Sequence, residues 1–398
     1  MDAETLARLA DLAVTFGANV QPGQIVSIEA DADMQPFVRA LARRCYEVGA
    51  KFVDPVYFDS EVKRSRLELA PLETLDFVPP WYGKRMLELG DVRAARIVAV
   101  PRVAPGILAG IEPERGGRDE LPDIRERLVI INKLLVNWSA IPYPTEAWAT
   151  VVFPDLPEAA ALERLTGELV FVCRLDEEDP TAAWRERADT LSAVAKRLTE
   201  HRFEAMRFQG NGTDLTVGLF PTSAWDAARM TTADGIVHMP NLPTEEIFTS
   251  PDPARADGVV QATKPLELGG TMVRGLRVRF EGGRAVEIDA DEGAGALRER
   301  AAVDDGASRL GEVALVDREG RIGQTRTTFY NTLLDENAAS HIALGSAYEF
   351  NVGEEHRPEV NHSMVHIDFM IGGDDVAVTG LAADGSEVPV LRGGVWQI

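Results

Sequence analysis

Hydrophobic positions in the first 60 residues alternate between two spacings. Between Leu6 and Phe16 they recur every three or four residues, which predicts a helix. A short apolar run at 25–28 predicts a strand, a second helical pattern covers 37–48, and an apolar segment at 52–58 predicts another strand. This order of strand, helix and strand is typical of a parallel β-α-β unit.

The rest of the first half continues this pattern. Apolar segments at 97–100 and 138–141 predict two further strands, with helical stretches between them. The segment 180–201 reads as one long helix, because Pro180 is suited to a helix start and apolar residues recur at helical spacing after it. We therefore expect an α/β layer whose sheet is largely parallel, followed by a helix that joins the two halves.

Hairpin signals dominate the second half. Asn211-Gly212 is the preferred dipeptide of a tight hairpin turn, and Gly282-Gly283 and Asp384-Gly385 lie in similar positions between alternating segments. The predicted fold class is thus α/β: an N-terminal α/β domain with a largely parallel sheet at 1–200, and a C-terminal α+β domain rich in antiparallel strands at 201–398.

Composition narrows the possible partners and compartment. The chain has 41 basic and 64 acidic residues, a net charge of −23, which disfavours nucleic acid and anionic membranes as partners. Its two cysteines, Cys45 and Cys173, are far apart and form no metal-binding motif, which fits a reducing cytoplasm. The acidic N-terminus does not resemble a signal peptide, and no apolar run is long enough for a membrane span. We expect a cytoplasmic protein.

Candidate chemistry is concentrated after residue 230, where five of the six histidines lie. On a strand, His366 and Asp368 would project from the same face, because alternate residues share a face. The pair could hold a divalent ion, or it could be a buried hydrogen-bonded pair within the sheet. The sequence pattern leaves both interpretations open.

A second candidate string runs from 335 to 348. Glu336 and His341 are five residues apart, so a straight helix would splay them, and their joint use requires a turn between them. His341 and Tyr348 would share a helical face if this segment were helical. Taken alone, Glu336 fits a role as a surface cap.

Two more acidic positions complete the set of candidates. Three prolines between 239 and 251 predict a stiff loop rather than a helix or central strand, and the paired acids Glu245 and Glu246 in it favour a cation or a solvated turn. Glu312 begins an apolar strand, a position that also suits the edge of a sheet. Motifs for phosphate-binding loops, serine hydrolases and HExxH zinc proteases are absent from the sequence.

Together these strings resemble metallopeptidase family M29, the thermophilic aminopeptidases. The resemblance covers most of the chain, including Val-Asn-Trp-Ser-Ala-Ile-Pro-Tyr-Pro-Thr-Glu-Ala-Trp at 136–148, and is strongest in the second half. It leaves out Glu245, which varies between members. It assigns metal ligation to six residues, namely Glu246, Glu312, Glu336, His341, His366 and Asp368.

The resemblance implies a metal-dependent aminopeptidase that acts on peptides with a free N-terminus. Four carboxylates and two imidazoles suit two divalent ions (zinc, cobalt, manganese or magnesium) that activate a water to hydroxide. Glu312 would bridge the two ions and shuttle a proton, and Tyr348 would donate a hydrogen bond to the tetrahedral intermediate. Members of the family form homodimers, so we expect one here.

Two other classes of function stay open at this level. His341, His366 and Asp368 have the composition of the triad that holds Fe(II) in oxygenases, and some ring-cleaving dioxygenases resemble this fold. Glu246 and Glu312 would have no role around one iron, which favours the peptidase. The third class is a peptide-binding protein without catalytic activity on the same scaffold.

Overall fold

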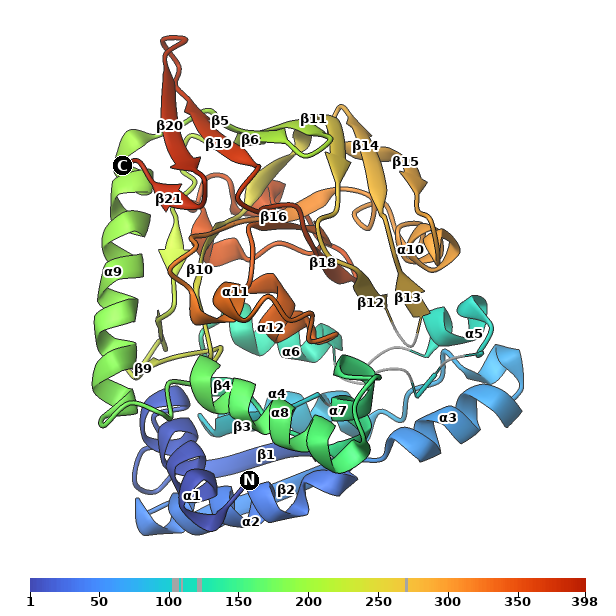
Figure 1. Cartoon of the computed structure of the whole chain (residues 1–398), viewed down its shortest axis with the longest axis vertical. Coiled ribbons are helices and arrows are strands. Elements are labelled where there is room, and N and C mark those ends of the chain that lie inside the picture. Colours follow the sequence, from blue (N-terminus) through green and yellow to red (C-terminus); the bar gives the residue numbers. More distant parts are fainter. Residues whose placement is uncertain (102–106, 109, 120–123, 269–270) are drawn as a thin grey trace. The chain divides into compact units, whose positions relative to one another are not determined.

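The computed structural model describes residues 1–101, 107–108, 110–119, 124–268 and 271–398 (Figure 1). The chain divides into two compact units. The first comprises Met1–Arg187 and Ala228–Thr244, and the second comprises Ala188–Ala227 and Glu245–Ile398. The division at residue 200 that the sequence suggested stays a prediction about folding domains.

The first unit is built on a four-stranded sheet in the order β2-β1-β3-β4. Its strands are β1 (Ile25–Asp31), β2 (Phe52–Phe58), β3 (Ala95–Val100) and β4 (Asn137–Pro142). All three strand pairs are parallel. Val26, Ile28 and Ile97 are fully buried, as expected for parallel strands that are covered on both faces. The predicted α/β layer with a parallel sheet is confirmed.

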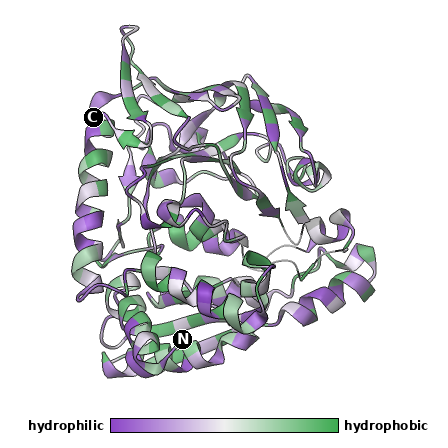
Figure 2. Ribbon diagram, viewed as in Figure 1, coloured by the Kyte–Doolittle hydropathy of each residue, from purple (hydrophilic) through white to green (hydrophobic). Residues whose placement is uncertain are grey.

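Helices precede, connect and follow these strands. They are α1 (Ala3–Asp11), α2 (Gln35–Glu47), α3 (Ser60–Leu69), α4 (Trp81–Asp91), α5 (Pro113–Arg118), α6 (Ile124–Asn132), α7 (Glu146–Val152) and α8 (Glu158–Val172). The helix α9 (Pro180–His201) has the predicted bounds, and its residues alternate between hydrophilic and hydrophobic in Figure 2. The predicted first helix is shorter as an α-helix, because a π-helical turn at Leu12–Gly17 continues α1. Two short strands of the first unit, β8 (Met230–Thr231) and β9 (Val237–His238), pair with each other.

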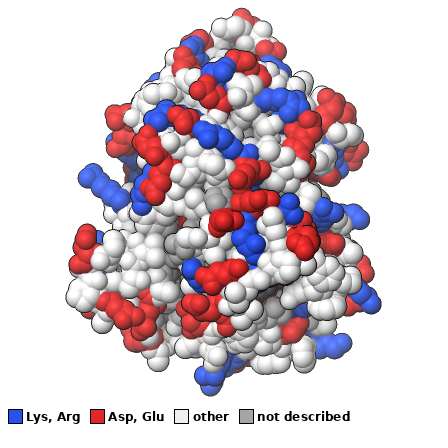
Figure 3. All heavy atoms as spheres, turned by 90° about the vertical axis from the view of Figure 1, so that its right-hand side faces the viewer, with Lys and Arg blue, Asp and Glu red and all other residues white. Residues whose placement is uncertain are grey.

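None of the helices in the described parts of the chain combines the length and the apolarity that crossing a bilayer requires. Acidic and basic side chains are interspersed on the face shown in Figure 3. The excess of acidic residues is thus spread among basic ones over that face.

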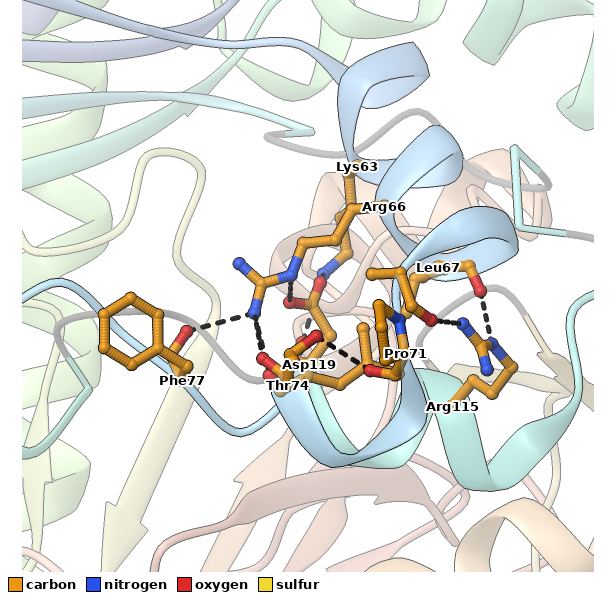
Figure 4. A network of polar contacts seen from close by, with 10 residues as sticks. Lys63, Arg66, Leu67, Pro71, Thr74, Phe77, Arg115 and Asp119 are labelled. Atoms are coloured by element: carbon orange, nitrogen blue, oxygen red, sulfur yellow. Dashed lines mark hydrogen bonds and ion pairs between the residues drawn. The ribbon is translucent and has the colours of Figure 1, made fainter.

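One connection in the first unit is held by a network of polar contacts (Figure 4). Asp119 forms ion pairs with Lys63 and Arg66 of α3, the latter at 3.1 Å between Nε and Oδ1. The Arg66 guanidinium also donates to the carbonyls of Leu75 at 2.9 Å and Phe77 at 3.0 Å. These bonds satisfy backbone groups in a segment without regular structure and fix it against α3.

A buried ion pair crosses the parallel sheet. The Arg96 guanidinium on β3 donates to Glu29 on β1 at 2.6 Å between Nη2 and Oε1. Both side chains are 2% exposed. Such a pair contributes little net stability when it is intact, but removal of one member leaves an uncompensated charge in a medium of low dielectric constant.

Replacement of Glu29 by alanine is therefore expected to destabilise the folded state by about 3–5 kcal/mol, because the Arg96 charge stays buried. Thermal and urea unfolding would measure the change. Arg43→Ala is the control, since Arg43 forms an ion pair with Glu47 at 3.0 Å but is 84% exposed, and it should leave the unfolding midpoint unchanged. Equal stability of the two variants would contradict the prediction.

The larger sheet of the second unit is antiparallel, with eight strands in the order β15-β14-β11-β6-β5-β19-β20-β21. Its three predicted hairpins are confirmed: β5 (Ala205–Gly210) with β6 (Thr213–Leu219), β14 (Arg277–Glu281) with β15 (Arg284–Asp289), and β19 (Ala377–Leu381) with β20 (Glu387–Arg392). The sheet is completed by β11 (Pro251–Gln261) and β21 (Val395–Trp396). A separate two-stranded sheet consists of β12 (Leu266–Leu268) and β13 (Thr271–Val273), and α10 (Ala294–Arg300) follows β15.

A second sheet in this unit carries the candidate site. Its order is β18-β17-β16-β10-β7, and every neighbouring pair is antiparallel. The strands are β7 (Asp226–Ala227), β10 (Glu246–Thr249), β16 (Leu310–Val316), β17 (His341–Gly345) and β18 (His366–Met370). On one face, Val313, Leu315, Ile342 and Phe369 are fully buried. The opposite face is free to present polar side chains.

The prediction of a loop for 239–251 is wrong in part. Residues 246–249 form β10, which pairs with β16 on one side and β7 on the other, so it is an internal strand. Pro240 and Pro243 precede this strand and Pro251 follows it, so every residue of the strand keeps its backbone donor. The prolines therefore border a short strand instead of preventing it.

Candidate metal centre

Five of the six predicted metal ligands lie on one face of the five-stranded sheet. Glu312 is paired with Ala343, and Ala343 is paired with Asp368 on the next strand. His341 is paired with Ala314, two residues along the strand from Glu312. Alternate residues and cross-strand partners share a face, so these side chains project together.

The outer strands complete the set. Glu246 begins β10 and is paired with Val316, two residues beyond Ala314 and on the same face of β16. His366 begins β18 and precedes Asp368 by two residues, so the alternation predicted for this pair is present. Ala314 and Ala343, whose side chains are short, lie on the same face between these residues.

The backbone at Gly311 determines how Glu312 is placed relative to β17. The register between β16 and β17 shifts between Leu310 and Glu312, and Gly311 lies at this irregularity. A Cβ atom on Gly311 would lie 2.3 Å from the carbonyl oxygen of Gly345 and 2.5 Å from that of Ser346. No side chain fits there. The strand begins at Leu310, two residues before the predicted start at Glu312.

Glu336 reaches the cluster from a helix. It is the last residue of α12 (Thr332–Glu336), and β17 begins at His341. The chain turns between them, which is the arrangement that joint use of the two residues requires. The segment from His341 is a strand, so the helical relation considered for His341 and Tyr348 does not apply.

The polar atoms of the cluster are close together. His341 Nε2 lies 3.2 Å from Glu246 Oε2 and 3.5 Å from Glu312 Oε1. His366 Nε2 lies 3.6 Å from Glu312 Oε2 and 3.3 Å from Asp368 Oδ1. The two oxygens of Glu312 thus face different imidazoles.

Three groups in this cluster have the composition and spacing of a metal site, with ligand atoms within 4.8 Å of one another. They are Glu246, Glu312 and His341; Glu312, His366 and Asp368; and Glu336, His341 and Asp368. Glu312, His341 and Asp368 each belong to two groups. All six predicted ligands are thereby brought together.

Backbone carbonyls orient both imidazoles. His341 Nδ1 lies 3.2 Å from the carbonyl oxygen of Ala339, and His366 Nδ1 lies 2.7 Å from that of Ser346. A carbonyl only accepts, so each Nδ1 carries the hydrogen and donates it. Each Nε2 is then directed at the carboxylates. This tautomer, with Nδ1 held by a carbonyl oxygen, is typical of histidines that bind metals.

The electrostatics of the cluster favour added positive charge. Burial raises the pKa of Glu336 well above the usual carboxyl range, and the charge of Glu246 acts in the same direction. Burial also raises the pKa of Glu312. Burial lowers the pKa of His366, but the charge of Asp368, its hydrogen bond with His366 and the charge of Glu312 together outweigh this effect and raise that pKa to about 10. Carboxylates placed this closely in a buried position retain protons unless cations compensate them.

Two atoms of the cluster support cation binding directly. Among the residues that the structure describes, Glu246 Oε2 and His341 Nε2 are buried and have no partner in hydrogen-bond geometry. Such atoms carry a cost of desolvation that a bound cation would offset. Carboxylate oxygens and imidazole nitrogens also form a donor set suited to divalent ions, so the residues fit the expected group.

Tyr348 borders the cluster. Its ring centroid lies 6.2 Å from that of His366 and 6.0 Å from that of Phe248, and its carbonyl oxygen accepts a hydrogen bond from Ser250 Oγ at 2.7 Å. Burial raises the pKa of the Tyr348 hydroxyl above its usual range, and the charge of Glu312 adds to this effect. The phenol therefore stays protonated and able to donate.

The adjacent acid Glu245 makes different contacts from Glu246. Its side chain is fully buried, and Oε1 accepts a hydrogen bond at 3.2 Å from the backbone nitrogen of Arg321, the first residue of α11 (Arg321–Thr325). It caps that helix. The exclusion of Glu245 from the ligand set agrees with this position.

Sequence reasoning gave no role to Asp335, which supports the site. Its carboxylate accepts hydrogen bonds from the backbone nitrogens of Phe329 at 2.9 Å and Asn331 at 3.1 Å, which fixes the turn before α12. Lys264 Nζ lies 3.8 Å from Asp335 Oδ1. The signal that could have identified Asp335 is its position immediately before Glu336.

Comparisons with known proteins agree with this geometry. The model of the family described as thermophilic metalloprotease (M29) matches residues 2–396. Aminopeptidase T of Thermus aquaticus is 44% identical, and the match covers 100% of both chains. Aminopeptidase AmpS of Bacillus subtilis is 38% identical over 99% of this chain and 98% of its own.

A solved structure is similar along the whole chain as well. Wild-type AmpT from Thermus thermophilus superposes with a TM-score of 0.90 and 40% sequence identity, covering 99% of each chain. An identity of this size over the full length reflects a shared fold and shared ancestry. The chain therefore belongs to the thermophilic metalloprotease family M29.

Proposed function

We propose that the protein is a metal-dependent aminopeptidase that removes N-terminal residues from peptides and uses two divalent cations. The observation that carries this proposal is the position of Glu312. Its Oε1 faces His341 at 3.5 Å and its Oε2 faces His366 at 3.6 Å. A carboxylate whose two oxygens face two separate groups of ligands would help to hold two cations.

The remaining ligands divide between the two ends of Glu312. Glu246 and His341 form one group with Glu312, His366 and Asp368 form another with it, and Glu336 groups with His341 and Asp368. When bound, two divalent cations would lower the pKa of a water and polarise the scissile carbonyl. Zinc, cobalt, manganese and magnesium are all candidates, since a site rich in oxygen ligands accepts each of them.

The side chains of the protein hold and move protons around this centre. Glu312 contacts both imidazoles, which suits it to accept the proton of the attacking water and pass it to the leaving amine. Tyr348, protonated and beside His366, would donate a hydrogen bond to the oxygen of the tetrahedral intermediate. The carboxylates also attract the positively charged amine of a free N-terminus, which would limit cleavage to the first residue.

Replacement of Tyr348 by phenylalanine is expected to lower kcat by about 10²- to 10³-fold, because one donor to the developing oxyanion is lost. Metal content should not change, because the hydroxyl is not among the proposed ligands. Steady-state rates with an aminoacyl p-nitroanilide and metal analysis measure the two quantities. Phe350→Leu, a change in the ring stacked on Tyr348 at 5.0 Å, is the packing control. Loss of metal in the Tyr348 variant would contradict this assignment and indicate a structural role.

The function is tested by metal titration combined with substrate specificity. The protein should bind two equivalents of Zn²⁺, Co²⁺ or Mn²⁺ per chain and then hydrolyse peptides from the N-terminus. Peptides with an acetylated N-terminus should not be cleaved, because they lack the cationic amine. Cleavage of acetylated peptides at the same rate, or binding of a single cation, would contradict the proposal.

The alternative functions make other predictions. A mononuclear Fe(II) dioxygenase would contain one iron and leave Glu246 and Glu312 without a role beside it. A peptide-binding protein without activity would bind peptides and show no turnover after cations are restored. A homodimeric state and a cytoplasmic location belong to the same proposal, and sedimentation velocity measures the first of these.

A further inference from the structure

Asn337 follows Glu336 at the end of α12 and is fully buried. Its side-chain oxygen Oδ1 accepts a hydrogen bond from the backbone nitrogen of Glu245 at 2.6 Å. Its Nδ2 donates to the carbonyl oxygen of Leu333 at 2.9 Å and lies 3.5 Å from Glu336 Oε1. Each end of the amide thus has a partner, which is the condition for a stable buried amide.

These bonds connect two parts of the chain that carry different carboxylates of the cluster. Glu245 and Asn337 are 92 residues apart. Glu245 immediately precedes Glu246, the first residue of β10, and Asn337 immediately follows Glu336. The amide therefore fixes the end of the helix to the beginning of the strand, next to both carboxylates.

The carboxylates of Glu246 and Glu336 repel each other when both are ionised, so something must hold their two chain segments together. The Asn337 amide does so without adding charge, whereas a lysine or arginine in its place would compete with a cation. The side chain of Glu245 reinforces the link by capping α11. Glu245, the residue before Glu246, is thus fixed by two contacts: its backbone nitrogen binds Asn337, and its side chain binds the start of α11.

We infer that Asn337 is a positioning residue that sets the distance between Glu246 and Glu336 and thereby the affinity of one of the two cation sites. This inference rests on the proposed function. Two of the three ligand groups contain Glu246 or Glu336, whereas the group of Glu312, His366 and Asp368 contains neither. The effect of Asn337 is therefore unequal between the two ends of Glu312.

The test uses Asn337→Leu, which keeps the size of the side chain and removes all three polar contacts. The full-length protein, freed of metal, is titrated with Co²⁺ by calorimetry and by absorption spectroscopy. We expect one of two equivalents to bind about 10- to 100-fold more weakly and the other to change by less than about threefold, as for loss of a residue that orients a metal ligand. A merely structural residue would change neither affinity. If the leucine variant does not fold, Asn337→Ala is titrated in the same way, because its smaller side chain lets water reach the backbone nitrogen of Glu245 and the carbonyl oxygen of Leu333.

Asn351→Leu is the matched control. Asn351 is also fully buried in the same unit, and its Nδ2 donates to Asp226 Oδ2 at 2.9 Å. Both variants should lower the unfolding temperature of the metal-free protein, but only the Asn337 variant should weaken cobalt. Unchanged cobalt affinities in both Asn337 variants, or equal weakening in the control, would overturn the inference. If the unmodified protein bound no second cation, the proposed function itself would fail, which is a distinguishable result.

Discussion

Glu312→Gln is expected to lower aminopeptidase activity by at least about 10³-fold, the largest effect of any single substitution in the cluster. The glutamine amide has one oxygen in place of two and cannot bridge two cations or accept the proton. Because its shape is nearly the same, the fold should persist. Hydrolysis of an aminoacyl p-nitroanilide and circular dichroism measure activity and folding in the same preparation.

The matched control is Glu168→Gln. Glu168 is 7% exposed, close to the exposure of Glu312 at 6%, but it lies in α8 of the first unit and pairs with Arg164 at 2.8 Å. This variant should retain its activity. Turnover of Glu312→Gln near that of the unmodified protein would show that the bridging role is wrong, even if the family assignment stands.

Removal of divalent cations by a chelator is expected to abolish activity completely and to lower thermal stability. Cations that bind only the folded state stabilise it by about 4 kcal/mol at a free concentration 1,000-fold above Kd. Their removal should therefore lower the unfolding midpoint by roughly 10 °C for a unit of this size. Calorimetry measures the midpoint, and rates are recorded before and after Zn²⁺, Co²⁺, Mn²⁺ or Mg²⁺ is restored.

The reversibility of this loss is the essential control. Restored cations should recover both the rate and the midpoint, whereas dialysis without chelator should change neither. Glu312→Gln should show a smaller shift of the midpoint on chelation, because its cation sites are already impaired. Full activity in a preparation with less than a tenth of an equivalent of metal would rule out a metal-dependent mechanism.

Most of the secondary structure could be predicted from the sequence because its signals are local. The helix from Pro180 to His201 and the hairpin at Asn211-Gly212 are specified by residues within a few positions of each other. The strand β10 was missed because nearby prolines dominate its local pattern, while its stability comes from pairing with β16 and β7, which are distant in the chain. The four residues of such a strand carry little local pattern from which the pairing could be predicted.

The same difference between local and nonlocal signals applies to the candidate site. Strand alternation predicts that His366 and Asp368 lie together, and the structure places them so. The approach of Glu246 to His341 depends on the register of three strands, and the position of Glu312 depends on the irregularity at Gly311, neither of which periodicity reveals. The resemblance to a known family supplied the six residues together; the role of Asn337 became visible only through its contacts.

The shared face of β16, β17 and β18 makes the cluster sensitive to changes in chain length. A residue inserted into β17 between His341 and Ala343 would have one of two consequences, because successive side chains on a strand point to opposite faces of the sheet. Either His341 would point to the apolar face of the sheet, or the pairing between Ala343 and Asp368 would shift by one residue. Insertions and deletions in these strands would therefore disrupt the fold and the chemistry together. Natural variation in loop length should therefore be confined to the connections outside these strands.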